Sequence, residues 1–133
     1  ENGVTACTDV TGFGLLGHLV EMTKASGCDV ELIVDSLPIL EGAEETVSAG
    51  ILSSLQPQNT RLRRAISNIE QWHAHPKYPL LFDPQTAGGL LASVPEDKAQ
   101  RCLEQLVDEG YSASVVVGRV KQRGTDDAAI TLV

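Results

Sequence analysis

The chain has 133 residues, of which 42% are hydrophobic and only 4% aromatic, and its formal net charge is −8. An acidic chain repels the phosphates of nucleic acids. Aromatic side chains are also too few to form a stacking platform for single strands. We therefore expect no nucleic-acid partner. The length predicts a single domain over residues 1–133, and no apolar run approaches the ~20 residues that span a bilayer, so we expect no membrane partner.

The first third of the chain alternates between strand and helix patterns. Residues 4–10 alternate small and β-branched side chains and predict a strand. Residues 15–26 place apolar side chains on one face at helical spacing, and Gly27 is suited to end that helix. Residues 28–34 predict a strand with one buried face. The alternating apolar residues of that face are Val30, Leu32 and Val34.

The middle of the chain predicts two helices and a turn between apolar runs. A helix over residues 38–50 would start near Pro38 and stop at Gly50. A second helix is predicted over residues 59–72 and a proline-containing loop over 73–79. The apolar side of the first helix would consist of Leu40, Ala43 and Val47. Apolar runs at 80–82 and 89–94 then flank a turn-rich insert and predict two strands.

The last third predicts one helix and two closing strands. The helix begins at Pro95, has acidic residues in its first turn and ends at Gly110. Residues 113–120 and 128–133 are apolar runs separated by a polar turn, as in a strand pair. Together these elements predict an α+β fold in which helices pack on a mixed sheet.

The three cysteines, Cys7, Cys28 and Cys102, are far apart. No C-x-x-C pair occurs, which leaves a zinc site poorly supported, and an odd number does not suit a disulfide framework. We expect buried, reduced cysteines and a cytoplasmic protein. No signal peptide is visible, and a chain that starts at Glu1 instead of Met predicts a fragment or a processed chain.

The stretch "CTDVTGFGLLGH" at residues 7–18 contains Gly12, Gly14 and Gly17 in the order G-x-G-x-x-G. This is the spacing of a dinucleotide-binding turn, and Asp35, after the second strand, lies about where a ribose-binding acid belongs. Glycines at this spacing can also do no more than let a helix and a strand pack closely.

Polar residues ahead of the first glycine argue against a dinucleotide. Thr8, Asp9 and Thr11 occupy the end of a strand that would be apolar in such a site, and a carboxylate would repel pyrophosphate in the absence of a metal ion. The alternative is that Asp9 holds a divalent cation while the following helix N-terminus offers amide donors to phosphate oxygens.

A second stretch, "FDPQTAGGLL" at residues 82–91, has the composition of a functional turn. Asp83 favours a turn, Gln85 and Thr86 offer side-chain hydrogen bonds, and the two glycines that follow allow close backbone approach. An ordinary connection between two strands is the alternative interpretation.

Other polar groups give weaker signals. His18 is predicted to flank the core, with a catalytic role as the alternative. His73 and His75 form an H-x-H pair without a third ligand, which favours surface residues over a metal site. Arg61, Arg63 and Arg64 predict a solvated helix face, with a phosphate clamp as the alternative. No G-x-x-x-x-G-K-[ST] motif occurs, which excludes a P-loop.

The stretches "ACTDVTGFGLLGHLVEM" and "LLFDPQTAGGLLASVP" closely resemble the second domain of the selenophosphate synthetases (selenide, water dikinases), which the aminoimidazole ribonucleotide synthetases share. The stretch at residues 53–66, "SSLQPQNTRLRRAI", also looks like part of that family. The resemblance covers essentially the whole chain. It implies an aminoimidazole ribonucleotide synthetase C-terminal-domain-like fold, and it implies that the G-x-G-x-x-G spacing is accidental.

The resemblance also implies a reaction and a set of site residues. The family converts ATP, selenide and water to selenophosphate, AMP and phosphate with magnesium, at a site between two domains. The nucleophilic cysteine or selenocysteine, its lysine and the other metal-binding aspartates belong to the first domain, so this chain holds no catalytic residue. By the resemblance, Asp9 is a magnesium ligand. The residues implied to bind the substrate ATP are Thr11, Gly12, Gly14, Asp83, Gln85 and Thr86.

The resemblance further implies that the first domain carries most of the subunit contact. We therefore expect a homodimer for the full-length chain and an inactive monomer for this domain alone. Two other functions stay open: another enzyme of the superfamily, such as an amidine-forming ligase, and a non-catalytic binding module that keeps the fold.

Overall fold

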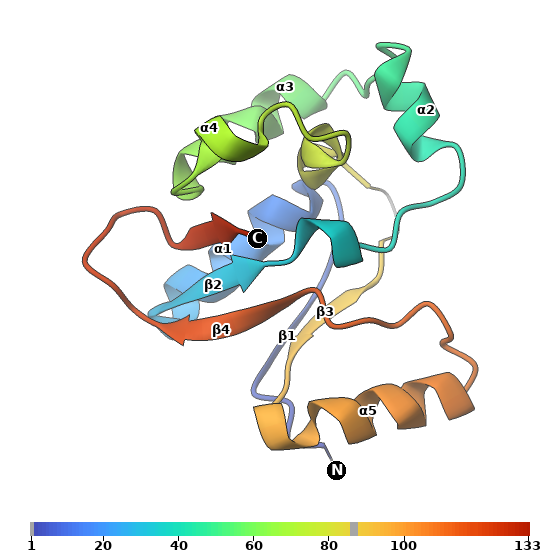
Figure 1. The fold of residues 1–133 in the computed structure, drawn as a ribbon, viewed down its shortest axis with the longest axis vertical. Coiled ribbons are helices and arrows are strands. Elements are labelled where there is room, and N and C mark those ends of the chain that lie inside the picture. The colour runs from blue at the N-terminus through green and yellow to red at the C-terminus, as the bar shows by residue number, and fades with distance from the viewer. Residues whose placement is uncertain (1, 86–87) are drawn as a thin grey trace.

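The computed structural model describes residues 2–85 and 88–133 and confirms the predicted α+β fold (Figure 1). Strands β1 (Ala6–Asp9) and β3 (Leu90–Ser93) form an antiparallel ribbon. In the other sheet, β2 (Cys28–Leu32) lies between antiparallel β4 (Gly118–Gln122) and parallel β5 (Ile130–Leu132). This second sheet is mixed, as the sequence predicts.

Helix α1 (Gly14–Ser26) connects the two sheets and packs its apolar residues into the core. It is rich in leucine, an intrinsic helix former, and Gly27 ends it as predicted. Gly27 has φ 60° and ψ 42°, and its N–H donates to the Thr23 carbonyl, which satisfies one free group at the helix end.

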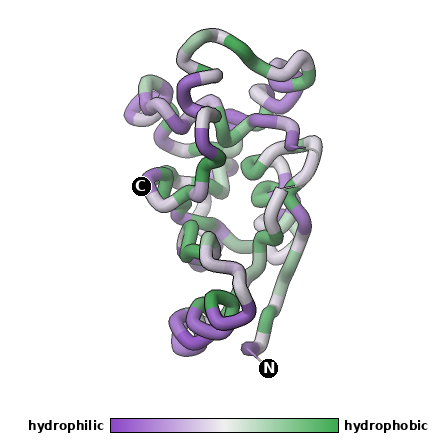
Figure 2. Tube along the Cα trace, turned by 90° about the vertical axis from the view of Figure 1, so that its right-hand side faces the viewer, coloured by the Kyte–Doolittle hydropathy of each residue, from purple (hydrophilic) through white to green (hydrophobic). Residues whose placement is uncertain are grey.

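The core is one cluster of residues from α1, β2, β5 and the segments that pack on them, including two short 3₁₀ helices that are described below. The predicted inward face of β2 and the residues after it is confirmed, because Val30, Leu32 and Val34 are all buried. Figure 2 shows hydrophobic segments running through the middle of the trace. The cluster consists of Leu16, Leu19, Val20, Val30, Leu32, Val34, Leu37, Ile66, Leu81, Phe82, Ile130 and Leu132.

The prediction of one helix over residues 59–72 is wrong. The segment forms α3 (Gln56–Asn59), the 3₁₀ helix η2 (Thr60–Ala65) and α4 (Ile69–Trp72). The break falls at Ile66, which takes an extended conformation, is buried and forms a bridge with Ile130 of β5. Burial of Ile66 against the sheet therefore overrides the helical spacing of its neighbours.

Two further elements differ from prediction. The helix expected over residues 38–50 is only α2 (Ala43–Ser48), and a short 3₁₀ turn, η1 (Val34–Ser36), precedes it. Leu40 lies outside the helix and is 83% exposed, so it is not on a buried face. The apolar run 80–82 belongs to the 3₁₀ helix η3 (Tyr78–Phe82) and is not a strand, because Pro79 favours the first turn of a helix.

Helix α5 (Glu96–Asp108) follows Pro95 with two acids in its first turn, as predicted. None of its residues is buried, and Figure 1 shows it at one end of the molecule, beside the N-terminus. Strand β4 begins at Gly118, later than predicted, and includes Lys121 and Gln122 of the expected turn. In the described part of the chain, no helix has the length and apolar character needed to cross a membrane.

The expectation of buried cysteines is wrong for Cys7. It lies in β1, where the two-residue period of the strand turns its side chain to solvent. Cys28 and Cys102 are half-buried, and all three thiols are free.

Candidate functional site

The two glycine-rich motifs of the sequence meet at one end of the β1–β3 ribbon. In the ladder Ala6 is opposite Ser93 and Asp9 is opposite Leu90. One residue beyond Asp9, the Val10 N–H donates to the Gly89 carbonyl, and the Gly88 N–H donates to the Val10 carbonyl, both at 2.9 Å. Figure 1 shows the two strands side by side. Residues about 80 positions apart in the sequence thus form one surface.

Asp9 ends β1 with its side chain exposed. Its carboxylate forms no hydrogen bond or ion pair with any residue that the structure describes. The neighbouring Thr8 hydroxyl donates to the Asp9 backbone carbonyl at 3.2 Å and leaves the carboxylate oxygens untouched. Leu90, opposite Asp9 in the ladder, is 78% exposed. The carboxylate is therefore available to a ligand from outside the chain.

Thr11 is held by a buried histidine. Its Oγ1 lies 3.1 Å from Nε2 of His18, which is one turn into α1 and buried. The other ring nitrogen, Nδ1, makes no hydrogen bond and lies 3.5 Å from a carboxylate oxygen of Glu21. The exposed ring of Phe13 covers His18, with 5.6 Å between ring centroids. The sequence predicted that His18 flanks the core, and the structure adds the contact with Thr11.

The three glycines of the G-x-G-x-x-G stretch have different surroundings. Gly14 has φ 71°, and a Cβ there would lie 3.0 Å from the Asp83 carbonyl oxygen. A Cβ on Gly17 would lie 2.6 Å from Cβ of Phe13. A Cβ on Gly12 would have no atom within 4 Å among the residues that the structure describes. Close packing therefore requires the second and third glycines, whereas the first leaves open space at the turn.

The dinucleotide interpretation is excluded by the topology. A dinucleotide-binding fold needs its first two strands to be parallel in one sheet, whereas β1 and β2 belong to different sheets. Asp35, the candidate ribose-binding residue, lies 3.2 Å from Nε2 of His75 through Oδ1.

The second turn packs directly against the first. The Gln85 N–H donates to the Asp83 carbonyl at 3.0 Å, and both side chains are half-buried. A Cβ on Gly88 would lie 2.3 Å from the Val10 carbonyl oxygen and 2.6 Å from Oε1 of Gln85. Glycine is therefore required where the turns touch. Thr86 lies outside the described residues.

Asn59 is a positioning residue that sequence reasoning missed. Its buried amide donates to the Gly12 carbonyl at 2.9 Å and to the Phe82 carbonyl at 3.1 Å, so it connects both turns. The only signal in the sequence is indirect, because Asn59 lies within the family-like stretch 53–66. A helical pattern cannot show that a polar side chain points inward to two distant carbonyls.

Tyr78 fixes the start of η3, the element that leads into Asp83. Its ring meets Phe82 edge to face, with 5.2 Å between centroids. Burial raises the pKa of Tyr78 above its usual 10.0, and the nearby Arg63 guanidinium partly opposes that rise. The neutral phenol therefore persists to higher pH than in an exposed tyrosine.

Metal ligands are sparse within the described residues, which contain no group of three or more His, Cys, Asp or Glu side chains able to hold an ion. His73 is exposed, with Nδ1 3.1 Å from the Glu70 carbonyl, and His75 packs its ring on Trp72. A magnesium ion commonly uses only one or two protein carboxylates, with water and phosphate oxygens completing its shell. The exposed carboxylate of Asp9 could contribute one ligand to a shared site of that kind.

The matched part of the chain spans about a third of the length of each of the curated relatives given below. The chain is 42% identical over 123 residues to "Selenide, water dikinase" of Caldanaerobacter subterraneus subsp. tengcongensis, covering 92% of this chain and 36% of that protein. It is 38% identical over 117 residues to "Selenide, water dikinase 2" of Peptoclostridium acidaminophilum, covering 88% and 33%. For "Selenide, water dikinase" of Clostridioides difficile the identity is 37% over 125 residues, covering 91% and 35%.

The family model of the C-terminal domain of AIR synthase related proteins matches residues 1–130. The match includes both glycine-rich turns, the ribbon that joins them and Asn59. The fold agrees, since helices pack on a mixed sheet. The chain therefore belongs to the family of AIR synthase related proteins, C-terminal domain.

Proposed function

We propose that these 133 residues are the second domain of a selenophosphate synthetase, which converts ATP, selenide and water to selenophosphate, AMP and phosphate. The observation that carries the proposal is the meeting of the two glycine-rich turns beside an exposed carboxylate, Asp9. The relatives named selenide, water dikinase support the choice of substrates.

In this proposal the first turn binds the phosphate end of ATP. Asp9 and the phosphate oxygens share a magnesium ion, which neutralises charge that develops during phosphoryl transfer. Gly12 lets phosphate approach the backbone, because no atom of the described residues lies within 4 Å of a Cβ placed there. Gly14 offers no backbone donor to phosphate, because its N–H already donates to the Thr11 carbonyl at 3.0 Å. Its part in the proposed site is to let the two turns pack closely.

His18 sets the direction of the Thr11 hydroxyl. When Nε2 carries the proton, it donates to Oγ1 across 3.1 Å, and the hydroxyl proton is then available to a phosphate oxygen. The second turn forms the other side of the proposed ATP site through Asp83 and Gln85, whose side chains are half-buried. We assign Thr86 to the same side of the site from the sequence alone.

The proposed site is half of a larger one. Within the described residues, Asp9 belongs to no group of three or more His, Cys, Asp or Glu side chains that could hold an ion by itself. The side chains of Phe13 and Leu90, 57% and 78% exposed, form an apolar border that the first domain would cover. We therefore assign the nucleophile and the remaining metal ligands to that domain. From the family resemblance we further propose that this chain alone is an inactive monomer and that the full-length protein is a homodimer, and from the odd number of free cysteines we propose a cytoplasmic location.

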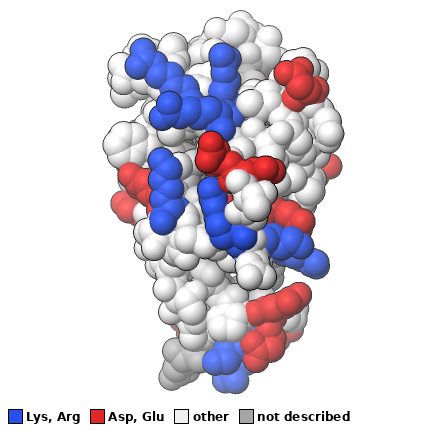
Figure 3. Space-filling model, turned by 90° about the vertical axis from the view of Figure 1, so that its left-hand side faces the viewer, with Lys and Arg blue, Asp and Glu red and all other residues white. Residues whose placement is uncertain are grey.

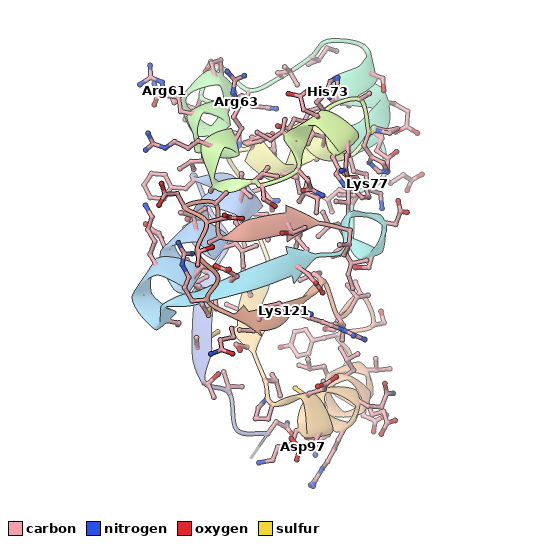
Figure 4. The ribbon with its side chains drawn as sticks, turned by 60° about the vertical axis from the view of Figure 1, so that its left-hand side comes forward. Arg61, Arg63, His73, Lys77, Asp97 and Lys121 are labelled. Atoms are coloured by element: carbon pink, nitrogen blue, oxygen red, sulfur yellow. The ribbon has the colours of Figure 1, made fainter. Side chains whose placement is uncertain are left out.

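The test is magnesium-dependent AMP formation by the full-length protein with selenide. Asp9→Asn keeps the side-chain shape but removes a ligating charge, which should cost several kcal/mol of transition-state stabilisation, or on the order of a thousandfold in turnover. Asp97→Asn is the matched control, because it removes the same charge from α5, which Figure 4 shows at the far end of the molecule. It should retain near-normal turnover.

Thermal melting should be unchanged in Asp9→Asn, because an exposed isosteric change usually costs less than about 0.5 kcal/mol. Asp97→Asn should melt slightly lower, because it removes an acid from the first turn of α5 that stabilises the helix by about 0.3–1 kcal/mol. Near-normal turnover of Asp9→Asn with a normal melt would remove Asp9 from the site. ATP consumption that depends on an amide substrate and not on selenide would identify another enzyme of the superfamily. No ATP-dependent reaction with either substrate would favour a binding module.

A further inference from the structure

A basic hollow lies on η2, outside the site described above, with a volume of about 410 Å³. Figure 3 shows one group of Lys and Arg side chains in the upper part of one face and further ones in its middle, with acidic side chains between them. Figure 4 shows Arg61 and Arg63 extending outward at that end. We call this feature the arginine hollow, and its lining residues are Pro57, Thr60, Arg61, Arg63 and Arg64.

The 3₁₀ geometry of η2 determines which side chains face outward. In a 3₁₀ helix, residues three positions apart lie on the same side. Leu62 and Ala65 share the side that packs on the core. Arg61 and Arg64 therefore share another side, and Arg63 is left to a third. All three arginines nevertheless line the hollow, because η2 is short and each of the two sides that they occupy is exposed.

The backbone of this segment is anchored from beneath. The buried Gln56 amide donates to the Pro79 carbonyl at 2.9 Å, and Asn59 holds the Gly12 and Phe82 carbonyls. The Thr60 hydroxyl donates to the Gln56 carbonyl at 3.0 Å. A ligand at the hollow would consequently meet a pre-formed backbone and would have to order only the arginine side chains.

The three arginines are not neutralised within the fold. None of the three guanidinium groups forms an ion pair or a side-chain hydrogen bond with a residue in the described ranges. By contrast, Arg123 contacts Asp29 at 2.7 Å and Lys121 contacts Glu31 at 3.2 Å. What distinguishes these arginines is their density, because three of the ten Lys and Arg residues of an acidic chain lie within four positions. Their mutual repulsion would be relieved by a bound anion.

We propose that the arginine hollow binds the diphosphate or triphosphate group of a small molecule without a metal ion. Guanidinium groups present paired N–H donors that match phosphate oxygens and keep their charge at all relevant pH values. The hollow is confined to one segment of an acidic chain, which favours a small anion over a nucleic-acid backbone. The group belongs either to a nucleotide or to free inorganic pyrophosphate.

The test is calorimetric titration of inorganic pyrophosphate into the full-length protein in EDTA. EDTA removes divalent ions and so silences the magnesium site of the proposed function. We expect saturable binding, weakened about tenfold or more when Arg61, Arg63 and Arg64 are all changed to Gln. Absence of saturable binding by the unmodified protein would overturn the proposal.

A matched control removes the same charge elsewhere. Lys98→Gln, Arg101→Gln and Arg119→Gln together change three exposed cations outside the hollow. This control should keep its affinity within about twofold, because screening at physiological salt limits the effect of distant charges. An equal loss in both triple variants would mean a general field effect and would overturn the site.

Two more measurements locate the bound anion, and a third identifies its source. Asp9→Asn should bind pyrophosphate with unchanged affinity in EDTA. Tighter binding would place the anion beside residue 9, because the substitution removes a carboxylate that repels phosphate when no metal ion is present, and it would overturn the inference. Pyrophosphate should also protect the arginines from modification by phenylglyoxal, a measurement that requires no variant to fold. Absence of protection would contradict the proposal.

Titration with ATP in EDTA distinguishes the two sources of the phosphate group. Equal affinity for ATP and pyrophosphate indicates recognition of the phosphate chain alone, and tighter binding of ATP indicates a nucleotide.

Discussion

The two 13-residue helices, α1 and α5, differ in how much of their surface the fold covers. α1 buries seven residues, including His18 and two glycines, whereas α5 buries none. α5 has the sequence of an amphipathic surface helix, and α1 is apolar over most of its circumference. The clearer amphipathic pattern therefore belongs to α5, which contributes less to the core than α1 does. The candidate site is built at the start of α1.

The largest test of this comparison is a pair of leucine truncations. Leu16 in α1 is fully buried, so Leu16→Ala should lower the free energy of unfolding by about 3–5 kcal/mol through lost contacts and a cavity. Leu106 in α5 is 36% exposed, so Leu106→Ala should cost less than about 1 kcal/mol. Urea denaturation of the full-length protein measures both. Similar losses would show that α5 is anchored as firmly as α1.

A second test removes the connection between the two turns that meet at the start of α1. Asn59→Ala deletes the buried amide and leaves the Gly12 and Phe82 carbonyls without their donor, which should cost about 2–3 kcal/mol. Gln100→Ala in α5 removes an exposed amide whose one hydrogen bond is to Glu104, and should cost less than about 0.5 kcal/mol. If both variants unfold at the same urea concentration, Asn59 does not hold the turns.

The smallest test separates glycines that pack from one that does not. Gly17→Ala in α1 would bring its Cβ to 2.6 Å from Cβ of Phe13, so the Phe13 side chain must shift at a cost of about 1–3 kcal/mol. Gly12→Ala meets open space and should change stability by less than about 0.5 kcal/mol. Melting temperatures rank the two. A Gly12→Ala variant that melts below Gly17→Ala would reverse the assignment.

The fold was predictable where local pattern and burial agree. The helix that ends at Gly27, the strand with inward Val30 and Leu32, and the helix that follows Pro95 all match. Prediction failed at Ile66, where pairing with a strand 64 residues later interrupts a helical pattern. Periodicity describes neighbours along the chain and holds no information about that partner.

The candidate site was predictable in its parts and not in its assembly. The resemblance pointed to Asp9 and the two glycine-rich turns, and it remains a prediction that they bind magnesium and ATP. The contact between Gly88 and Val10, the hydrogen bond between Thr11 and His18, and the burial of Asn59 all depend on tertiary structure. Only the folded chain gives a packing reason for Gly14 and Gly17.

The pairing of β1 with β3 has a consequence for the order of folding. The Thr5 side chain and the Ser93 carbonyl that it contacts are 88 positions apart, so the ribbon closes a loop of most of the chain. Loop-closure entropy makes such long-range contacts slow to form, whereas α1 and β2 are adjacent in sequence and can associate early. We therefore expect the ribbon to form late, after the α1–β2 core. The ligand site would then be absent from early folding intermediates and would appear only with the last native contacts.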